Sequence, residues 1–400
     1  MLKGWILMYK YNVREEKFGA TIYDLIKGKR FYISNDELNT LYKEKRFPKD
    51  LEYLNVKDSE LKITRKNNRE LLNCFSFADI AYVELTRSCN LRCKHCLNNS
   101  GEALDNQLNY EEFRDMIMNF SKSGIQEIRF TGGEPLVFSG IFDLIKLCTD
   151  LGIYTSIGTN GTLISKKVAQ KLKEAGLKKA IVSIDGTEKK HDYIRGSGNY
   201  KKAMVGIDNL LELGIDVRVN SVIMKENIDD VIQFAKQMNT KKQLLFIRRF
   251  IESGRGTNML NNMLTKDDYD YVRKQLRNEL ETGKYVNGHY LRNKDEVVNS
   301  RIDIPFKIKD GCKAGERALV ITPDGDIHLC GFLAAQGFSP VGNVRNVVDW
   351  NEFWLEIHNK KLLKNLEDSL SKYNETSGIQ KTNCLAYVQR VLTLEGKKRL

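Results

Sequence analysis

The sequence predicts an α/β fold built on a partial (β/α)6 TIM barrel, with a small N-terminal α+β module and a C-terminal region that contains a β-hairpin. Two observations carry this prediction. Between residues 81 and 250, six short apolar runs alternate with segments of helical periodicity. Later, Pro323-Asp324-Gly325 separates two alternating apolar runs, which is typical of a hairpin. Strands that alternate with helices pair in parallel, and six such units close only part of a barrel.

The predicted barrel strands cover residues 81–86, 126–131, 153–159, 179–185, 216–222 and 243–248. Start and stop signals mark the helices between them. Asn109 precedes Glu112 at capping-box spacing, and Ser165 opens another helical run. Gly176 and Gly214 close two helices, because glycine readily adopts the left-handed conformation found at helix ends.

Residues 1–75 have a different pattern and predict a separate small module, α+β or winged-helix-like. Strand-like runs at residues 5–11 and 29–34 flank a run of helical character at residues 22–26, and a charged tract follows at residues 36–50. No residue of this module has the pattern of a catalytic group.

The 400-residue length suits two or three domains. No run of eighteen apolar residues occurs, and the N-terminus lacks a signal-peptide pattern. We therefore expect a cytoplasmic protein without a membrane segment. In that compartment the eight cysteines are expected to be metal ligands or buried thiols rather than disulfides. Cys148 lies on an apolar helix face and is expected in the core.

The net charge of +12 raises the possibility of nucleic-acid binding. However, the lysines are spread along the chain, often beside glutamates, which is typical of a solvated surface. No helix-turn-helix, zinc-finger or aromatic RNA-binding motif accompanies them, so nucleic acid is not an expected partner. A basic surface would equally attract an acidic peptide or an anionic cofactor.

Three cysteines, Cys89, Cys93 and Cys96, lie within eight residues on the predicted loop that leaves the first barrel strand. Three thiolates on one loop can close around a soft metal centre and leave one position open for chemistry. A structural zinc site usually needs four ligands in two pairs, and no second pair lies nearby. A four-iron cluster normally uses four cysteines, so three would leave one iron without a protein ligand.

This Cys-x3-Cys-x2-Cys spacing, with His95 before the last cysteine, resembles the radical S-adenosylmethionine (radical SAM) family. The resemblance implies a 4Fe-4S cluster whose free iron binds the amino and carboxylate groups of S-adenosylmethionine. The reduced cluster then releases a 5′-deoxyadenosyl radical from that cofactor. It also implies an electron donor such as flavodoxin or ferredoxin. His95 is expected to pack against the cluster or cofactor rather than to ligate iron.

Polar and glycine-rich clusters follow the predicted strands at their carboxyl ends, which is where barrel enzymes place their chemistry. The resemblance implies that Gly132, Gly133 and Glu134 hold the methionyl amino group of the cofactor. It also implies that Arg195 meets the methionyl carboxylate. The further cofactor contacts that it implies are Thr159, Asn160, Ser183, Asp185 and Asn220. Taken singly, several of these motifs are also common strand-exit turns.

The C-terminal third offers three further cysteines, Cys312, Cys330 and Cys384. With the hairpin, this region resembles the start of a SPASM or Twitch auxiliary-cluster domain. A full SPASM domain carries more cysteines, and none lies between Cys330 and Cys384, so the resemblance implies at most one auxiliary iron–sulfur cluster. The alternative is a degenerate domain that binds no iron. The predicted domains are then residues 1–75, a barrel at 76–250, a helical linker at 251–310, and a Twitch/SPASM-like hairpin-plus-helix domain at 311–400.

Radical SAM enzymes with such a tail commonly modify peptides. The resemblance therefore implies a maturase of ribosomally made peptides (RiPPs) that installs a thioether or carbon–carbon crosslink, with residues 1–75 binding a leader peptide as an added strand. Three alternatives remain open. One is a sulfatase (formylglycine) maturase, another is a small-molecule radical SAM enzyme, and the third is a non-catalytic iron–sulfur protein that binds peptides or carries electrons.

Overall fold

A computed structural model describes residues 9–45, 56–65, 75–287, 314–315 and 317–359. Its centre is a ten-stranded sheet in the order β11-β10-β9-β8-β7-β6-β5-β12-β13-β14. The strands from β11 to β12 pair in parallel, whereas β13 and β14 add in antiparallel fashion. The six predicted barrel strands are confirmed as β5 (Ile80–Glu84), β6 (Glu127–Thr131), β7 (Tyr154–Thr159), β8 (Lys179–Ser183), β9 (Asp216–Ile223) and β10 (Leu245–Arg249).

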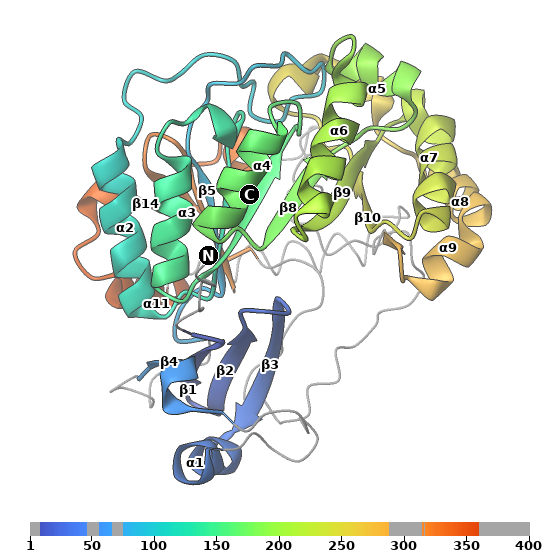
Figure 1. Ribbon diagram of the computed structural model, residues 1–400. Helices are drawn as coiled ribbons and strands as arrows, with labels where there is room; N and C mark the ends of the chain where they lie inside the picture. The colour runs from blue at the N-terminus through green and yellow to red at the C-terminus, as the bar shows by residue number, and fades with distance from the viewer. Residues whose placement is uncertain (1–8, 46–55, 66–74, 288–313, 316, 360–400) are drawn as a thin grey trace.

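Helices cover the outer face of this sheet (Figure 1). They are α2 (Tyr110–Ser123), α3 (Ile141–Asp150), α4 (Lys166–Ala175), α5 (Glu188–Arg195), α6 (Asn199–Glu212) and α7 (Ile228–Thr240), with short 3-10 turns η3 (Pro135–Val137), η4 (Lys225–Asn227), η5 (Gly254–Asn258) and η6 (Leu260–Asn262). The predicted caps are confirmed: Asn109 and Glu112 form a capping box, and Ser165 caps α4. Apolar side chains between helices and sheet form the main core, and Cys148 is fully buried in it as predicted.

The N-terminal module contains β1 (Tyr11–Glu16), β2 (Gly19–Asp24), β3 (Lys29–Ser34), α1 (Asn35–Glu44), η2 (Asp58–Glu60) and β4 (Leu61–Thr64), in the strand order β3-β2-β1-β4. The prediction of helical character at residues 22–26 is wrong, because Ile22 lies in β2 and pairs with Phe31 of β3. Its apolar spacing fits a helix, but pairing on both sides of β2 decides for a strand. The strand predicted at residues 5–11 falls mostly outside the described residues, and β1 begins at Tyr11.

Buried polar contacts dock this module on the amino ends of the barrel strands, opposite their carboxyl ends. Arg14 is fully buried, and its Nη2 donates to Oδ1 of Asp79 at 2.8 Å. The amide of Asn12 donates to the carbonyls of Ile125 and Gly152 at 3.1 and 3.0 Å. Figure 1 shows the module in blue at that end of the barrel. The module therefore covers the amino ends of β5, β6 and β7, which form the floor of the barrel.

The C-terminal hairpin is confirmed as β12 (Ala318–Ile321) and β13 (Asp326–His328), and it extends the barrel sheet beside β5. Other elements beyond residue 250 are α8 (Lys266–Gln275), α9 (Arg277–Thr282), β11 (Val286–Asn287), α10 (Gly331–Ala335), β14 (Gly342–Asn343), η8 (Val344–Asn346) and α11 (Trp350–Asn359). Since β11 and β12 belong to the barrel sheet, that sheet continues past the predicted boundaries at 250 and 311. The domain boundaries themselves stay a prediction.

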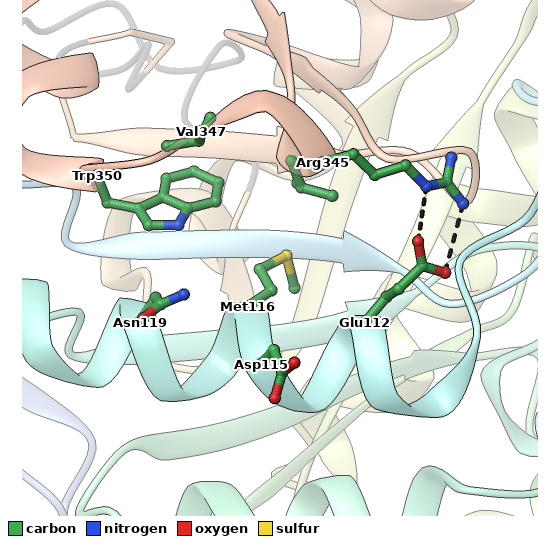
Figure 2. Close-up of a pocket in the computed structure, with 8 residues that line it drawn as sticks. Glu112, Asp115, Met116, Asn119, Arg345, Val347 and Trp350 are labelled. Carbon is green, nitrogen blue, oxygen red and sulfur yellow. Dashed lines mark hydrogen bonds and ion pairs between the residues drawn. The ribbon is translucent and has the colours of Figure 1, made fainter.

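Figure 2 shows a small pocket where the C-terminal segment meets α2 on the helical side of the sheet. Arg345 closes one end of it by donating to Glu112 at 2.6 Å. None of the predicted site residues lines this pocket. No helix among the described residues has both the length and the apolar character needed to cross a membrane.

Candidate active site at the carboxyl ends of the strands

The cysteine loop leaves β5 and is held in a closed shape by its own backbone. The N–H of Cys89 donates to the carbonyl of Gly101 at 3.1 Å, and the N–H of Gly101 donates to Arg87 at 2.9 Å. Two thiols accept hydrogen bonds from backbone amides: Leu91 N–H lies 3.4 Å from Cys89 Sγ, and Ser100 N–H lies 3.3 Å from Cys96 Sγ. The loop thus presents its sulfur atoms to donors, which suits thiolates.

Gly132 and Gly133 bring the loop after β6 into contact with the start of the cysteine loop. A Cβ atom on Gly133 would lie 2.2 Å from the carbonyl oxygen of Ser88, and one on Gly132 would lie 2.5 Å from that of Thr86. Gly132 also has a φ of +133°. Larger residues are therefore excluded on steric grounds. These glycines allow close approach to the neighbouring strand exit, and their contact with the methionyl amino group of the cofactor stays a prediction.

Glu134 is fully buried beside the end of β7. Its carboxylate accepts hydrogen bonds from the Thr159 hydroxyl at 2.7 Å, the Asn160 N–H at 2.8 Å and the Leu136 N–H at 3.2 Å. Burial raises the pKa of Glu134 to about 7, although these donors oppose the shift. Because a carboxylate offers about four acceptor positions, one remains for a further donor.

Asp185, at the exit of β8, connects three parts of the rim. Its Oδ2 lies 2.7 Å from Nε2 of His95 and accepts from Nε of Arg195 at 2.6 Å, while its Oδ1 accepts from the Val222 N–H at 2.8 Å. Burial alone would raise the pKa of Asp185, but the Arg195 guanidinium and His95 hold it well below its usual range. Asp185 is therefore an anion fixed between the cysteine loop, α5 and β9.

Arg195 connects Asp185 to the cysteines, because its Nη1 lies 3.9 Å from Sγ of Cys93. Burial is the largest influence on Cys93 and raises the pKa of its thiol, and the Arg195 charge opposes that shift. Asn160 contacts the same loop from β7: its amide donates to Oδ1 of Asn90 at 2.9 Å. The rim is therefore connected: Arg195 joins Asp185 to Cys93, and Asn160 joins the exit of β7 to the cysteine loop through Asn90.

Ser183 and Asn220 pair in register on β8 and β9 and lie below that rim. Within the described residues, Oδ1 of Asn220 is buried and accepts no hydrogen bond. Neither side chain has a hydrogen bond to the cysteine loop among the described contacts. Both therefore belong to the concave face of the sheet rather than to the loop network.

Comparison with known proteins shows which family has this arrangement of residues. Residues 83–238 match the Radical SAM superfamily model. The chain belongs to the radical SAM enzymes. The matched region contains the cysteine loop, Glu134, Asp185 and Arg195, so the family assignment rests on the rim that the structure assembles.

Two groups of relatives have similar sequences. The AdoMet-dependent heme synthase of Nitratidesulfovibrio vulgaris is 28% identical over 307 residues, which are 72% of this chain and 82% of that protein. Mycofactocin maturase MftC of Mycolicibacterium smegmatis is 28% identical over 276 residues, 68% of either chain.

Two solved structures show the same fold at low sequence identity. Streptococcus suis SuiB bound to precursor peptide SuiA has a TM-score of 0.66 and 17% identity, covering 86% of this chain and 87% of that one. Native anSMEcpe with bound AdoMet and Cp18Cys peptide has a TM-score of 0.61 and 18% identity, covering 78% and 89%.

Radical SAM enzymes use a 4Fe-4S cluster and S-adenosylmethionine, and the rim residues fit both groups. The three loop cysteines offer sulfur ligands, two of them already facing amide donors, and Arg195 places positive charge beside Cys93. Glu134 has an acceptor position left for an amino group. No three His, Cys, Asp or Glu side chains in the described ranges converge on a single-ion site, so the fit rests on the sulfur environment and the charges.

Sequence reasoning missed three residues of this radical SAM site. Arg255 donates from Nε to the Cys93 carbonyl at 2.9 Å and from Nη1 to the Ser100 carbonyl at 2.6 Å, so it clamps the cysteine loop. Asn90 joins the loop to β7, and Nδ1 of His191 accepts from the Asp185 N–H at 3.2 Å. The glycines flanking Arg255 were the one available signal, since they let its backbone reach the loop.

Of the three auxiliary-cluster ligands that the resemblance predicts, only Cys330 lies among the described residues. Cys312 and Cys384 fall outside the described residues. Cys330 is partly exposed at the start of α10 and packs with Ile251 and Leu333.

Proposed function

We propose that this radical SAM enzyme matures a ribosomally made precursor peptide and installs a thioether or carbon–carbon crosslink. The observation that carries the proposal is the N-terminal module, which is fixed to the barrel by buried polar contacts. Its β3 is an edge strand: within the described ranges, β3 pairs only with β2. An edge strand offers unpaired backbone groups to which a peptide can add as a further strand.

Two relatives support a peptide substrate. MftC is named as a mycofactocin maturase, and SuiB has been solved bound to precursor peptide SuiA. SuiB resembles 86% of this chain in fold, so the likeness includes more than the barrel. We propose that a leader segment binds the N-terminal module while the segment to be modified reaches the rim.

The rim residues have distinct roles in the proposed reaction. When bound, the cluster and S-adenosylmethionine supply a carbon radical that removes hydrogen from unactivated carbon. Cys89, Cys93 and Cys96 would hold the cluster, and Glu134 would accept a hydrogen bond from the cofactor's amino group. Asp185 positions Arg195, which balances the charge of Cys93 and lies where a carboxylate can dock.

Forming a thioether takes one hydrogen atom from carbon and one proton and one electron from the thiol. We propose that an auxiliary iron–sulfur cluster, held by Cys330 with Cys312 and Cys384, accepts that electron. An external donor such as flavodoxin or ferredoxin would reduce the first cluster for each cleavage of S-adenosylmethionine.

The decisive experiment uses anaerobically reconstituted, reduced protein with S-adenosylmethionine and a candidate precursor peptide. We expect 5′-deoxyadenosine and a peptide product that has lost two hydrogen atoms per crosslink, measured by mass spectrometry. Absence of 5′-deoxyadenosine would rule out radical chemistry, and 5′-deoxyadenosine with every tested peptide unchanged would argue against a peptide substrate.

Binding at β3 can be measured without turnover. Deleting the module would expose Asp79 and the barrel floor, so hydrogen exchange on the full chain is the cleaner test. We expect slower exchange of the amides of residues 29–34 when the leader peptide is added, with no change in the buried strand β8. Equal exchange in β3 with and without peptide would contradict the leader-binding role.

A small-molecule substrate is the second candidate, because the heme synthase relative covers 72% of this chain. The same assay with a porphyrin in place of the peptide tests it. A sulfatase maturase is less well supported, because the few C-terminal cysteines leave at most one auxiliary cluster.

A further inference from the structure

The concave face of the barrel carries three arginines from different strands: Arg129 of β6, Arg218 of β9 and Arg248 of β10. Side chains alternate along a strand. Val217 and Val219 pack in the core on the helical side of β9, so Arg218 between them faces the concave side.

Aromatic rings hold these guanidinium groups. Cζ of Arg218 lies 4.4 Å from the centre of the Phe246 ring, and Cζ of Arg248 lies 5.3 Å from the same ring. Cζ of Arg129 lies 5.0 Å from the ring of Tyr82, its register partner on the neighbouring strand β5. Such stacking positions a cation.

One buried donor of Arg218 has no acceptor in the part of the chain that the structure describes. Within the described residues, its Nε is buried without a hydrogen-bond acceptor. Burial, followed by the nearby charges of Arg129 and Arg248, lowers the pKa of Arg218 to about 9, so it stays charged at neutral pH. Glu127, an acid whose charge acts on Arg218, is already engaged by Arg129 at 2.8 Å and by Tyr23 at 3.2 Å.

The strand register places Arg218 inside the barrel and Arg248 near the rim. Arg248 pairs in register with Val222, whose N–H binds Asp185. Arg218 precedes Val222 by four residues, which places it about 13 Å deeper along β9. Arg218, Phe246 and Arg248 therefore form a column that leads from the rim toward the floor.

We propose that Arg218, supported by Arg129 and Arg248, binds a carboxylate of the substrate inside the barrel. A guanidinium with free donors matches a carboxylate in bidentate geometry. Anchoring the substrate away from its reacting carbon would position that carbon at the rim. The proposal deepens the proposed function: a peptide acid and a porphyrin propionate present the same chemistry, and the experiment separates them.

The test measures equilibrium binding to reconstituted, S-adenosylmethionine-loaded enzyme by titration calorimetry. One arm uses the probe acetyl-Ala-Glu-Ala-amide and its glutamine counterpart, and the other uses coproporphyrin III and its tetramethyl ester. We expect the acid in one arm to bind at least about tenfold more tightly than its neutral form, and Arg218→Gln to remove that preference. The arm that responds identifies the source of the carboxylate.

Controls separate this role from a structural one. Lys179→Gln removes a cation of the same sheet that is already paired with Asp216 at 2.7 Å, so the preference for the acid should persist. Arg218→Gln is expected to melt no lower than the parent, since an unpaired buried charge is removed. If Arg218→Gln does not fold, Arg218→Lys keeps the charge without the planar fork and should still weaken binding.

Acid and neutral probes that bind equally in both arms, or that do not bind, would overturn the proposal. So would an Arg218→Gln variant that retains the preference for the acid. Because this readout needs no turnover, it can succeed or fail independently of 5′-deoxyadenosine formation, which tests the proposed function.

Discussion

Asp185 holds Arg195 against the cysteine loop: Nε of Arg195 donates to Oδ2 of Asp185 at 2.6 Å, and Nη1 of the same guanidinium lies 3.9 Å from Sγ of Cys93. The two residues come from the exit of β8 and the end of α5. Asp185 also binds His95 of the loop, so one buried carboxylate fixes two groups beside the thiols. Asp185 is thus a positioning residue for the radical SAM site.

Replacing Asp185 by asparagine should therefore uncouple cluster binding from cofactor cleavage. All three cysteines remain, so the iron content should persist, while Arg195 loses its anionic partner and 5′-deoxyadenosine formation should fall at least tenfold. Removing one member of a buried pair costs about 3–5 kcal/mol of unfolding free energy. Asp216→Asn, at an exposed ion pair, is the matched control and should change neither the iron content nor 5′-deoxyadenosine formation. Parent-like cleavage by Asp185→Asn would contradict this role.

The cysteines should separate into ligands and core thiols. Cys93→Ser is expected to lose most of the iron and all cleavage of S-adenosylmethionine. Cys148→Ala should retain both, because Cys148 is fully buried in the apolar core, where burial raises its thiol pKa to about 12. Iron analysis and 5′-deoxyadenosine assays on the two variants check this. Equal iron loss in both would mean that cluster content reports only general stability.

Affinity for S-adenosylmethionine should rise with pH through the titration of Glu134. Burial raises the pKa of Glu134 to about 7, so a lower pH protonates it and removes a negatively charged acceptor for the cofactor's amino group. Between about pH 6 and pH 7.5 the affinity should increase roughly tenfold, because the carboxylate fraction increases by that factor. Calorimetric titrations at both pH values measure the change. Glu134→Gln should bind weakly and show a smaller rise with pH; a rise as large as the parent's in that variant would assign the effect elsewhere.

The docking of the N-terminal module should depend on Arg14. Its guanidinium is fully buried and binds Glu16, Asp79 and the carbonyl of Ala78. Arg14→Met leaves Asp79 with fewer partners, and we expect a loss of about 3–5 kcal/mol in unfolding free energy. Arg114→Ala removes an exposed pair with Glu111 and should cost less than about 1 kcal/mol. Denaturant unfolding compares the two, and equal losses would show that the Arg14 contacts do not stabilise the docked module.

Local sequence patterns were enough to predict the strands and helices of the barrel. Each strand–helix unit has its own apolar period and caps, such as Asn109 and Ser165, and these act within a few residues. The N-terminal module was harder to predict, because the apolar spacing around Ile22 fits a helix. Only its pairing with Phe31 makes that segment a strand.

The amino-acid sequence by itself determined the order of strands and helices, the three-cysteine loop and the placement of the polar motifs at the strand exits. These depend on spacing along the chain. Tertiary structure alone decided that Asp185 binds Arg195 and His95 and that Arg255 clamps the loop. It also decided that, among the described residues, Nε of Arg218 is buried without an acceptor. Those relationships join residues far apart in sequence. The burial of these side chains and their contacts with charged neighbours exist only once the sheet has curved and the loops have packed.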